Sequence, residues 1–119
     1  MKDIDSKKLD NLISSFIEDR DWDQFHSIKN LSMALSVETS ELIEIFQWMR
    51  EEESNKVAAD VNLKAKVEEE LADIFIYLFR IATKCEIDLE EVVLKKIKMN
   101  SEKYPVEKSR GNSTKYTEL

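Results

Sequence analysis

The chain has 119 residues, 42% hydrophobic and 36% charged, a length that allows one domain with one core. Its formal net charge of −7 excludes a nucleic-acid backbone as the expected partner, because proteins that bind one concentrate Lys and Arg. A single cysteine, Cys85, with neither a secretory signal nor an apolar run of about 20 residues, favours a reducing cytoplasmic setting away from membranes.

One Gly and one Pro leave little turn chemistry for a sheet and leave long helices undisturbed. Apolar residues at helical spacing predict a first helix over residues 6–20, and the polar, aromatic segment DRDWDQFHS predicts a connection. A second helix is expected from about Ser27 or Asn30 to about Glu52. The segment EEESNKVAADVN that follows is expected to be a loop with room for a short helical piece.

A third helix is predicted from about Leu63 to Lys84. Its segment LADIFIYLFRIA is apolar nearly all round, and only Asp73 and Arg80 are charged there. A helix of this kind is covered on every side, so we expect a homo-oligomer with this helix near the interface.

A fourth helix is predicted to open at Asp88, where DLEE offers an N-cap, and to end near Pro105. Residues 105–119 have no period and are expected to be an irregular tail. Four helices predict one all-α domain over residues 1–119, a four-helix bundle completed by oligomerisation.

Two helices carry acidic pairs within their apolar stripes. Glu38 and Glu41 lie three residues apart on the inward face of the second helix, and Glu70 and Asp73 repeat that spacing on the third. Two antiparallel helices joined by the predicted loop could bring the pairs face to face. Two like charges about 4 Å apart repel by about 4 kcal/mol at an effective dielectric of 20, so the site needs protons or cations.

An all-oxygen site without a clustered histidine suits a hard cation, Mg²⁺ or Mn²⁺. A di-iron bundle would use Glu-x-x-His pairs, and the only histidine, His26, does not follow a glutamate at that spacing. The alternative is an ordinary solvated acidic face. The presence of two such pairs among large apolar residues brings the two interpretations to near-equal weight.

A nucleobase needs a flat apolar clamp with a few polar groups at its edge. Trp48 follows Glu41 by seven residues, and Tyr77 follows Asp73 by four, so each is predicted to lie beside the acids. The aromatic connection adds three more candidates, Trp22, Phe25 and His26. Ordinary aromatic core is the competing interpretation of these side chains.

The segments VETSELIEIFQW and EEELADIFIYL together resemble the MazG-like all-α nucleoside triphosphate pyrophosphohydrolases, whose pattern is ExxE, a spacer and ExxD. RDWDQFHSIKNL, CEIDLEEVVLKKIKMNSEKYP and the terminal KYTEL resemble the dCTP pyrophosphatase branch in particular. The resemblance covers about residues 18–119. One departure is Val37, where larger members have a further glutamate, and it leaves open the number of metal ions.

The resemblance implies an oligomer, a dimer or a tetrameric dimer of dimers, and Mg²⁺-dependent hydrolysis of a dNTP to dNMP and pyrophosphate. It makes Glu38, Glu41, Glu70 and Asp73 the metal ligands and catalytic acids. It favours Trp22, His26, Trp48 and Tyr77 for the nucleoside. It also places Lys96, Asn100 and Tyr104 at the phosphates and sugar, with Lys115 and Tyr116 as weaker candidates.

Two other function classes stay open on the sequence. One is a non-catalytic helical oligomerisation or adaptor module, in which the acids form a solvated groove. The other is a regulatory nucleotide binder that keeps the pocket without turnover. Base preference is also open, since aromatic stacking accepts any base, and dATP is an alternative to dCTP.

Overall fold

The computed structural model describes residues 1–119, and all of its regular elements are helical. The long helices are α1 (Ser6–Asp19), α2 (Ile28–Phe46), α4 (Val61–Lys84) and α5 (Leu89–Lys103). The short elements are η1 (Asp23–Phe25), α3 (Glu51–Ser54), η2 (Val57–Ala59), α6 (Val106–Ser109) and η3 (Tyr116–Glu118). The all-α prediction is confirmed, as is the helical piece expected in the loop. None of these helices combines the length and hydropathy needed to cross a bilayer.

Each long helix begins at a short polar side chain that caps its free backbone N–H groups. Asp5, Ser27, Asp60 and Asp88 each accept a hydrogen bond from the backbone N–H three residues on, at 3.0 to 3.1 Å. The predicted cap at Asp88 is confirmed, and the cap at Ser27 rather than Asn30 marks the start of α2.

The cap of α4 provides a first test of the fold. Replacing Asp60 with alanine removes the acceptor for the Leu63 N–H, and we expect a loss of about 1 kcal/mol in the free energy of unfolding. Asp60→Asn keeps an acceptor at the same place and is the matched control. Urea denaturation followed by circular dichroism measures both, and equal midpoints for the two variants would contradict the capping role.

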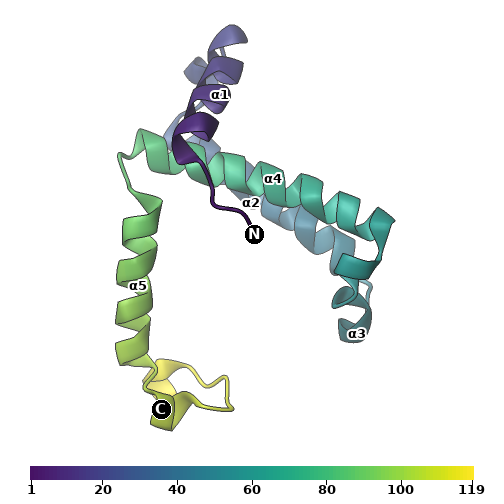
Figure 1. Ribbon diagram of the computed structural model, residues 1–119, viewed down its shortest axis with the longest axis vertical. Coiled ribbons are helices and arrows are strands. Elements are labelled where there is room, and N and C mark those ends of the chain that lie inside the picture. The colour runs from purple at the N-terminus through teal and green to yellow at the C-terminus, as the bar shows by residue number, and fades with distance from the viewer. The chain divides into compact units, whose positions relative to one another are not determined.

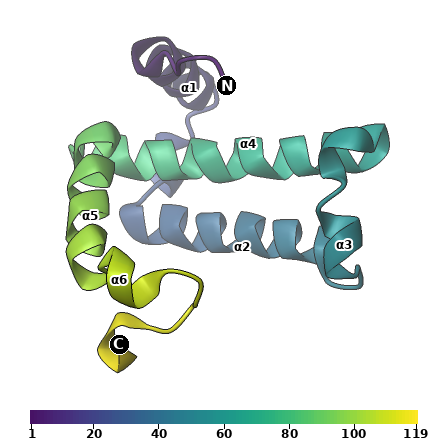
Figure 2. The same ribbon diagram turned by 60° about the horizontal axis from the view of Figure 1, so that its bottom comes forward.

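The chain divides into two compact units, Met1–Glu86 and Ile87–Leu119. In the first unit α2 and α4 lie side by side and antiparallel, as Figures 1 and 2 show, and they make the most extensive contact in the chain. α1 packs against α4 as well. Only Ile17, Leu31 and Ala82 are buried apolar residues, so the core of this unit is small.

The second predicted helix is shorter than expected, because α2 ends at Phe46 rather than near Glu52. Met49 donates its N–H to the Phe46 carbonyl at 2.9 Å, and extended backbone at Arg50 then starts α3. The first turn of α3 contains three consecutive glutamates. Carboxylates are favoured at a helix N-terminus and disfavoured at a C-terminus, which explains why the acidic run begins a new helix instead of extending α2.

In the second unit the segment after α5 folds back onto the end of that helix. The Tyr104 and Tyr116 rings meet edge to face with centroids 5.8 Å apart, and the Lys103 ammonium lies 4.8 Å from the Tyr116 centroid. Residues 105–119 are therefore not wholly irregular, since they contain α6 and η3.

Candidate metal centre and its surroundings

Three carboxylates converge where α2 faces α4. One carboxylate oxygen from each of Glu38, Glu41 and Glu70 lies within 4.8 Å of the other two. Glu38 and Glu41 share a face of α2 by their spacing, and the antiparallel pairing of the helices brings Glu70 opposite them. The structure thus brings together three of the four acids that the sequence singled out.

The crowding of these carboxylates changes their acidity. Desolvation, followed by the hydrogen bond and charge of Glu41, raises the pKa of Glu38 from 4.5 to about 7. Desolvation and the hydrogen bond with Glu41 also raise the pKa of Glu70. Near neutral pH Glu38 is therefore partly protonated, and a bound cation would displace that proton.

Two buried oxygens of the cluster, Oε2 of Glu38 and Oε2 of Glu70, receive no hydrogen bond from any group outside the cluster. A buried carboxylate oxygen without a partner is costly, and most such atoms in proteins are paired. A set of metal ligands made only of carboxylates, with unpaired oxygens, fits a hard divalent cation such as Mg²⁺.

Asp73 and Tyr77 lie at the edge of the cluster. Asp73 is exposed and outside the three-carboxylate group, yet its charge contributes to the raised pKa of Glu38 and Glu70. Burial raises the pKa of the half-buried Tyr77, and the charges of Glu38 and Asp73 raise it further. Tyr77 therefore keeps its phenolic proton beside the acids, as a potential hydrogen-bond donor.

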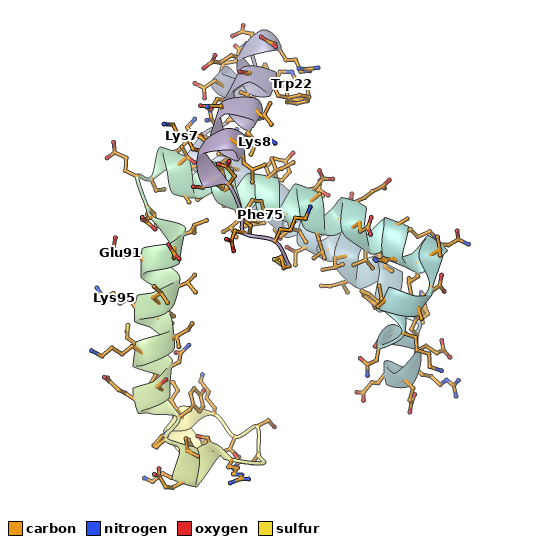
Figure 3. All side chains as sticks on the ribbon, in the orientation of Figure 1. Lys7, Lys8, Trp22, Phe75, Glu91 and Lys95 are labelled. Atoms are coloured by element: carbon orange, nitrogen blue, oxygen red, sulfur yellow. The ribbon has the colours of Figure 1, made fainter.

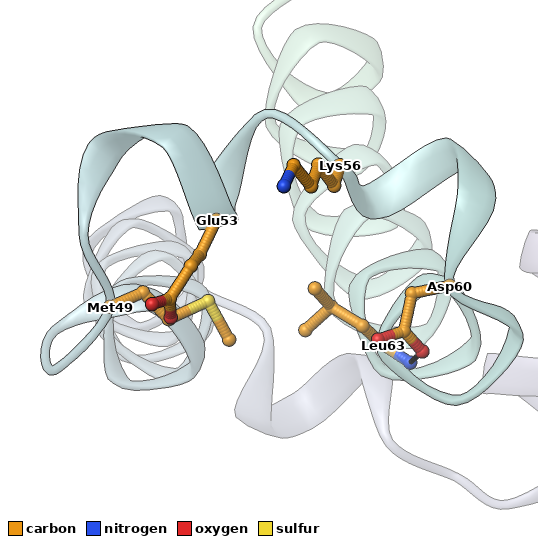
Figure 4. A pocket seen from close by; sticks show the side chains of 5 residues that line it. All are labelled: Met49, Glu53, Lys56, Asp60 and Leu63. Carbon is orange, nitrogen blue, oxygen red and sulfur yellow. Dashed lines mark hydrogen bonds between the residues drawn. The ribbon is translucent and has the colours of Figure 1, made fainter.

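A groove of about 450 Å³ continues from the cluster toward the ends of α2 and α4. It is lined by Glu41, Glu44, Ile45, Met49, Leu63, Lys66, Glu69 and Glu70. A smaller hollow of about 240 Å³ shares Met49 and Leu63 with it. Figure 4 shows Met49 and Glu53 on one side of that hollow and Leu63 and Asp60 on the other. The groove gives the carboxylates an open, acidic approach.

Trp48 is not where the sequence placed it. The prediction extended α2 through Trp48 and put its ring two turns from Glu41 on one face. The helix ends two residues earlier, at Phe46, and the Trp48 side chain is 90% exposed in the turn that follows. Met49, the next residue, lines the groove instead.

Trp22 and His26 belong to the segment between α1 and α2, which crosses α4 (Figure 2). The Trp22 ring, labelled in Figure 3, stands edge to face against Phe16 of α1, with centroids 5.6 Å apart. His26 is half-buried, and burial together with the charges of Arg80 and Lys84 lowers its pKa. Its imidazole is therefore neutral at pH 7, and its buried Nδ1 has no hydrogen-bond partner.

Lys96, Asn100 and Tyr104 lie in the second unit and follow one another at spacings of four residues, which puts them on one face at the C-terminal end of α5. Lys96 and Asn100 are exposed, and Tyr104 is held by Tyr116 of the tail. Their expected role at the phosphates stays a prediction.

Comparisons with known proteins show the family to which the chain belongs. The model of the MazG-like family matches residues 33–119, a stretch that includes all four acids. The chain belongs to the MazG-like family. The crystal structure of a pyrophosphatase from Archaeoglobus fulgidus has the same fold, with a TM-score of 0.79 and 37% identity. That match covers 88% of this chain and 96% of the archaeal one.

Two mammalian relatives of this MazG-like chain are named dCTP pyrophosphatase 1. The protein from Bos taurus is 45% identical and that from Homo sapiens 42% identical, each over 108 residues. Each alignment covers 91% of this chain, and the chain spans 64% of the length of these relatives.

Three residues near the candidate site were missed by sequence reasoning. Arg80 and Lys84 of α4 both bind the carboxylate of Asp23. These ion pairs attach the segment before α2 to α4. The sequence did contain a signal. Two cations lie four residues apart at the C-terminal end of a mostly apolar segment, where they need acidic partners. The sequence offers several acids, however, and only the folded chain selects Asp23.

Proposed function

We propose that the chain is a Mg²⁺-dependent nucleoside triphosphate pyrophosphohydrolase that converts a dNTP and water into dNMP and pyrophosphate. The preferred substrate is dCTP or a base-modified dCTP, and the reaction cleans or balances the nucleotide pool. The observation that carries the proposal is the convergence of Glu38, Glu41 and Glu70 within 4.8 Å in a MazG-like chain. The names of the mammalian relatives support the choice of substrate.

The cation would be held by Glu38, Glu41 and Glu70, with Asp73 beside them; Mn²⁺ is a possible substitute. When bound, Mg²⁺ would offset the charge of the triphosphate, polarise the α-phosphate and lower the pKa of an attacking water. Without that offset, the carboxylates would repel the substrate. Tyr77, protonated at neutral pH beside Glu38 and Asp73, has an O–H to donate at the edge of the cluster.

The remaining substrate contacts follow from the chemistry of the side chains. Trp22, which is 43% exposed, offers a ring face for base stacking, and the imidazole of half-buried His26 would meet a base edge. Lys96, Asn100 and Tyr104 would hold the phosphates and sugar. A role for Trp48 in base binding stays a prediction, as does Tyr77 in the nucleoside pocket.

We also infer a homo-oligomer, with a tetramer as the expected form. The first unit buries only three apolar residues, whereas Leu71 and Leu78 of α4 are 50% and 39% exposed. Large apolar surfaces of this kind mark interfaces in folded proteins. A second copy of the chain would cover α4.

The bond that is cleaved gives the deciding experiment. Incubation of the protein with Mg²⁺ and each dNTP and NTP, followed by anion-exchange chromatography, is expected to yield dCMP and pyrophosphate from dCTP at the highest rate. Orthophosphate together with dCDP would contradict attack at the α-phosphorus. Absence of turnover with all nucleotides would favour the adaptor module, or a regulatory binder if calorimetry still detected nucleotide binding.

A further inference from the structure

The segment Arg20–Ser27, here called the arm, has a conformation fixed by its own hydrogen bonds. Asp21 adopts a left-handed backbone, with φ at 52°, and this turns the chain away from α1. The Trp22 N–H bonds the Ile17 carbonyl at 3.1 Å, and Gln24 donates to the carbonyl and carboxylate of Asp21 at 3.0 and 3.1 Å. A non-glycine residue in this conformation is uncommon and persists where its surroundings determine it.

Two cations of α4 then fix the arm to the helix pair. Oδ1 of Asp23 accepts hydrogen bonds from Arg80 Nη2 at 2.7 Å and from Lys84 Nζ at 3.2 Å. Lys84 Nζ also donates to the backbone carbonyl of His26. The side chains of Arg80 and Lys84 are only 14% and 25% exposed, so their charges depend on these acceptors.

These cations continue the helix face that carries the acids. Glu70, Asp73, Tyr77, Arg80 and Lys84 succeed one another at spacings of three or four residues along α4. At 1.5 Å per residue, Arg80 lies about 10 Å beyond Asp73 along the helix axis. The same face therefore holds carboxylates at one end and the anchored arm at the other.

We propose that Asp23, Arg80 and Lys84 are positioning residues that hold the arm so that Trp22 and His26 meet the nucleobase. This inference rests on the proposed function, because it assumes a triphosphate at the carboxylate cluster. One feature supports a role beyond stability. Trp22 is 43% exposed although the arm is anchored, so part of its ring remains accessible to a ligand.

The substitutions Asp23→Asn and Arg80→Met are expected to raise the KM for dCTP about tenfold while kcat changes less than about threefold, because a loosened arm weakens binding of the base. The ratio of kcat/KM between dCTP and other dNTPs is expected to fall. In a Trp48→Phe background, where Trp22 is the sole tryptophan, acrylamide quenching of Trp22 fluorescence is expected to increase in the same variants.

Asp19→Asn is the matched control, since Asp19 is an exposed aspartate at the end of α1 without an ion pair, and it is expected to keep the KM of the unsubstituted protein. Unchanged KM and base discrimination in Asp23→Asn, with normal turnover, would overturn the positioning role alone. A lowered kcat with an unaltered KM would also overturn it. Absence of turnover by the unsubstituted protein would instead contradict the proposed function on which the positioning role depends.

Discussion

Replacing Glu38 with glutamine is expected to lower the rate of dNTP hydrolysis by at least about a hundredfold, because groups that merely orient metal ligands already cost 10–100-fold when removed. One carboxylate oxygen of Glu38 lies within 4.8 Å of oxygens of Glu41 and Glu70, and its Oε2 is one of the unpaired buried oxygens. Glutamine fills the same space with one charge fewer. Steady-state assays at saturating Mg²⁺ and dCTP measure the effect, and a rate near that of the unsubstituted protein would contradict the metal-site assignment.

The same substitution is expected to lower activity but to raise the stability of the metal-free protein. The pKa of Glu38 is raised from 4.5 to about 7 in the folded chain, so the folded state binds this proton more tightly than the unfolded state. The contribution of this proton to stability is complete below pH 4.5 and is lost as the pH rises through about 7. At about pH 8 without metal, Glu38→Gln is therefore expected to melt at a higher temperature than the unsubstituted protein.

Adding Mg²⁺ distinguishes the effect of carboxylate repulsion on stability from the effect of metal binding. It should raise the melting temperature of the unsubstituted protein more at about pH 8 than at about pH 5.5, because protons compete with the ion for the carboxylates. In Glu38→Gln this gain should be largely lost. Glu68→Gln is the control, since Glu68 is exposed on α4, two residues before Glu70, and outside the cluster. Equal gains in both variants would argue that Mg²⁺ binds elsewhere.

The helices were predictable because each carries its own signals. Helical spacing of apolar residues and the Asp88 cap identified α5, and the bounds of α1 and α4 agree with the predictions to within two residues. The end of α2 was missed since neither Gly nor Pro marks it. Glu51–Glu53 favour a helix N-terminus over a continuing helix, a weak electrostatic effect that apolar periodicity does not detect.

The candidate site was only partly predictable for a similar reason. Spacing along one helix placed Glu38 with Glu41, and the short loop made an antiparallel partner bearing Glu70 reasonable. The placement of Trp48 on the helix face of Glu41 was wrong because it depended on α2 continuing past Phe46. The pairing of Asp23 with Arg80 joins residues 57 positions apart, and no local period encodes such a contact.

Replacing Leu78 with glutamate is expected to dissociate the protein into monomers and to lower its melting temperature by many degrees. Leu71 and Leu78 are separated by about two helical turns, so they lie on one side of α4. Half-buried Phe75, labelled in Figure 3, comes between them in the sequence. A carboxylate buried at an apolar interface without a partner costs several kcal/mol, which is a large part of the stability of a domain of this size.

Light scattering coupled to size-exclusion chromatography measures the assembly, and thermal unfolding at several protein concentrations measures its link to folding. Since the first unit buries few apolar side chains, its melting temperature should rise with protein concentration, as it does when folding and association are coupled. Asn62→Glu adds the same charge in the first turn of α4, where an acid is tolerated, and should leave both measurements unchanged. A concentration-independent monomer would mean that α4 is stable with its apolar side uncovered, and the oligomer inferred here would be wrong.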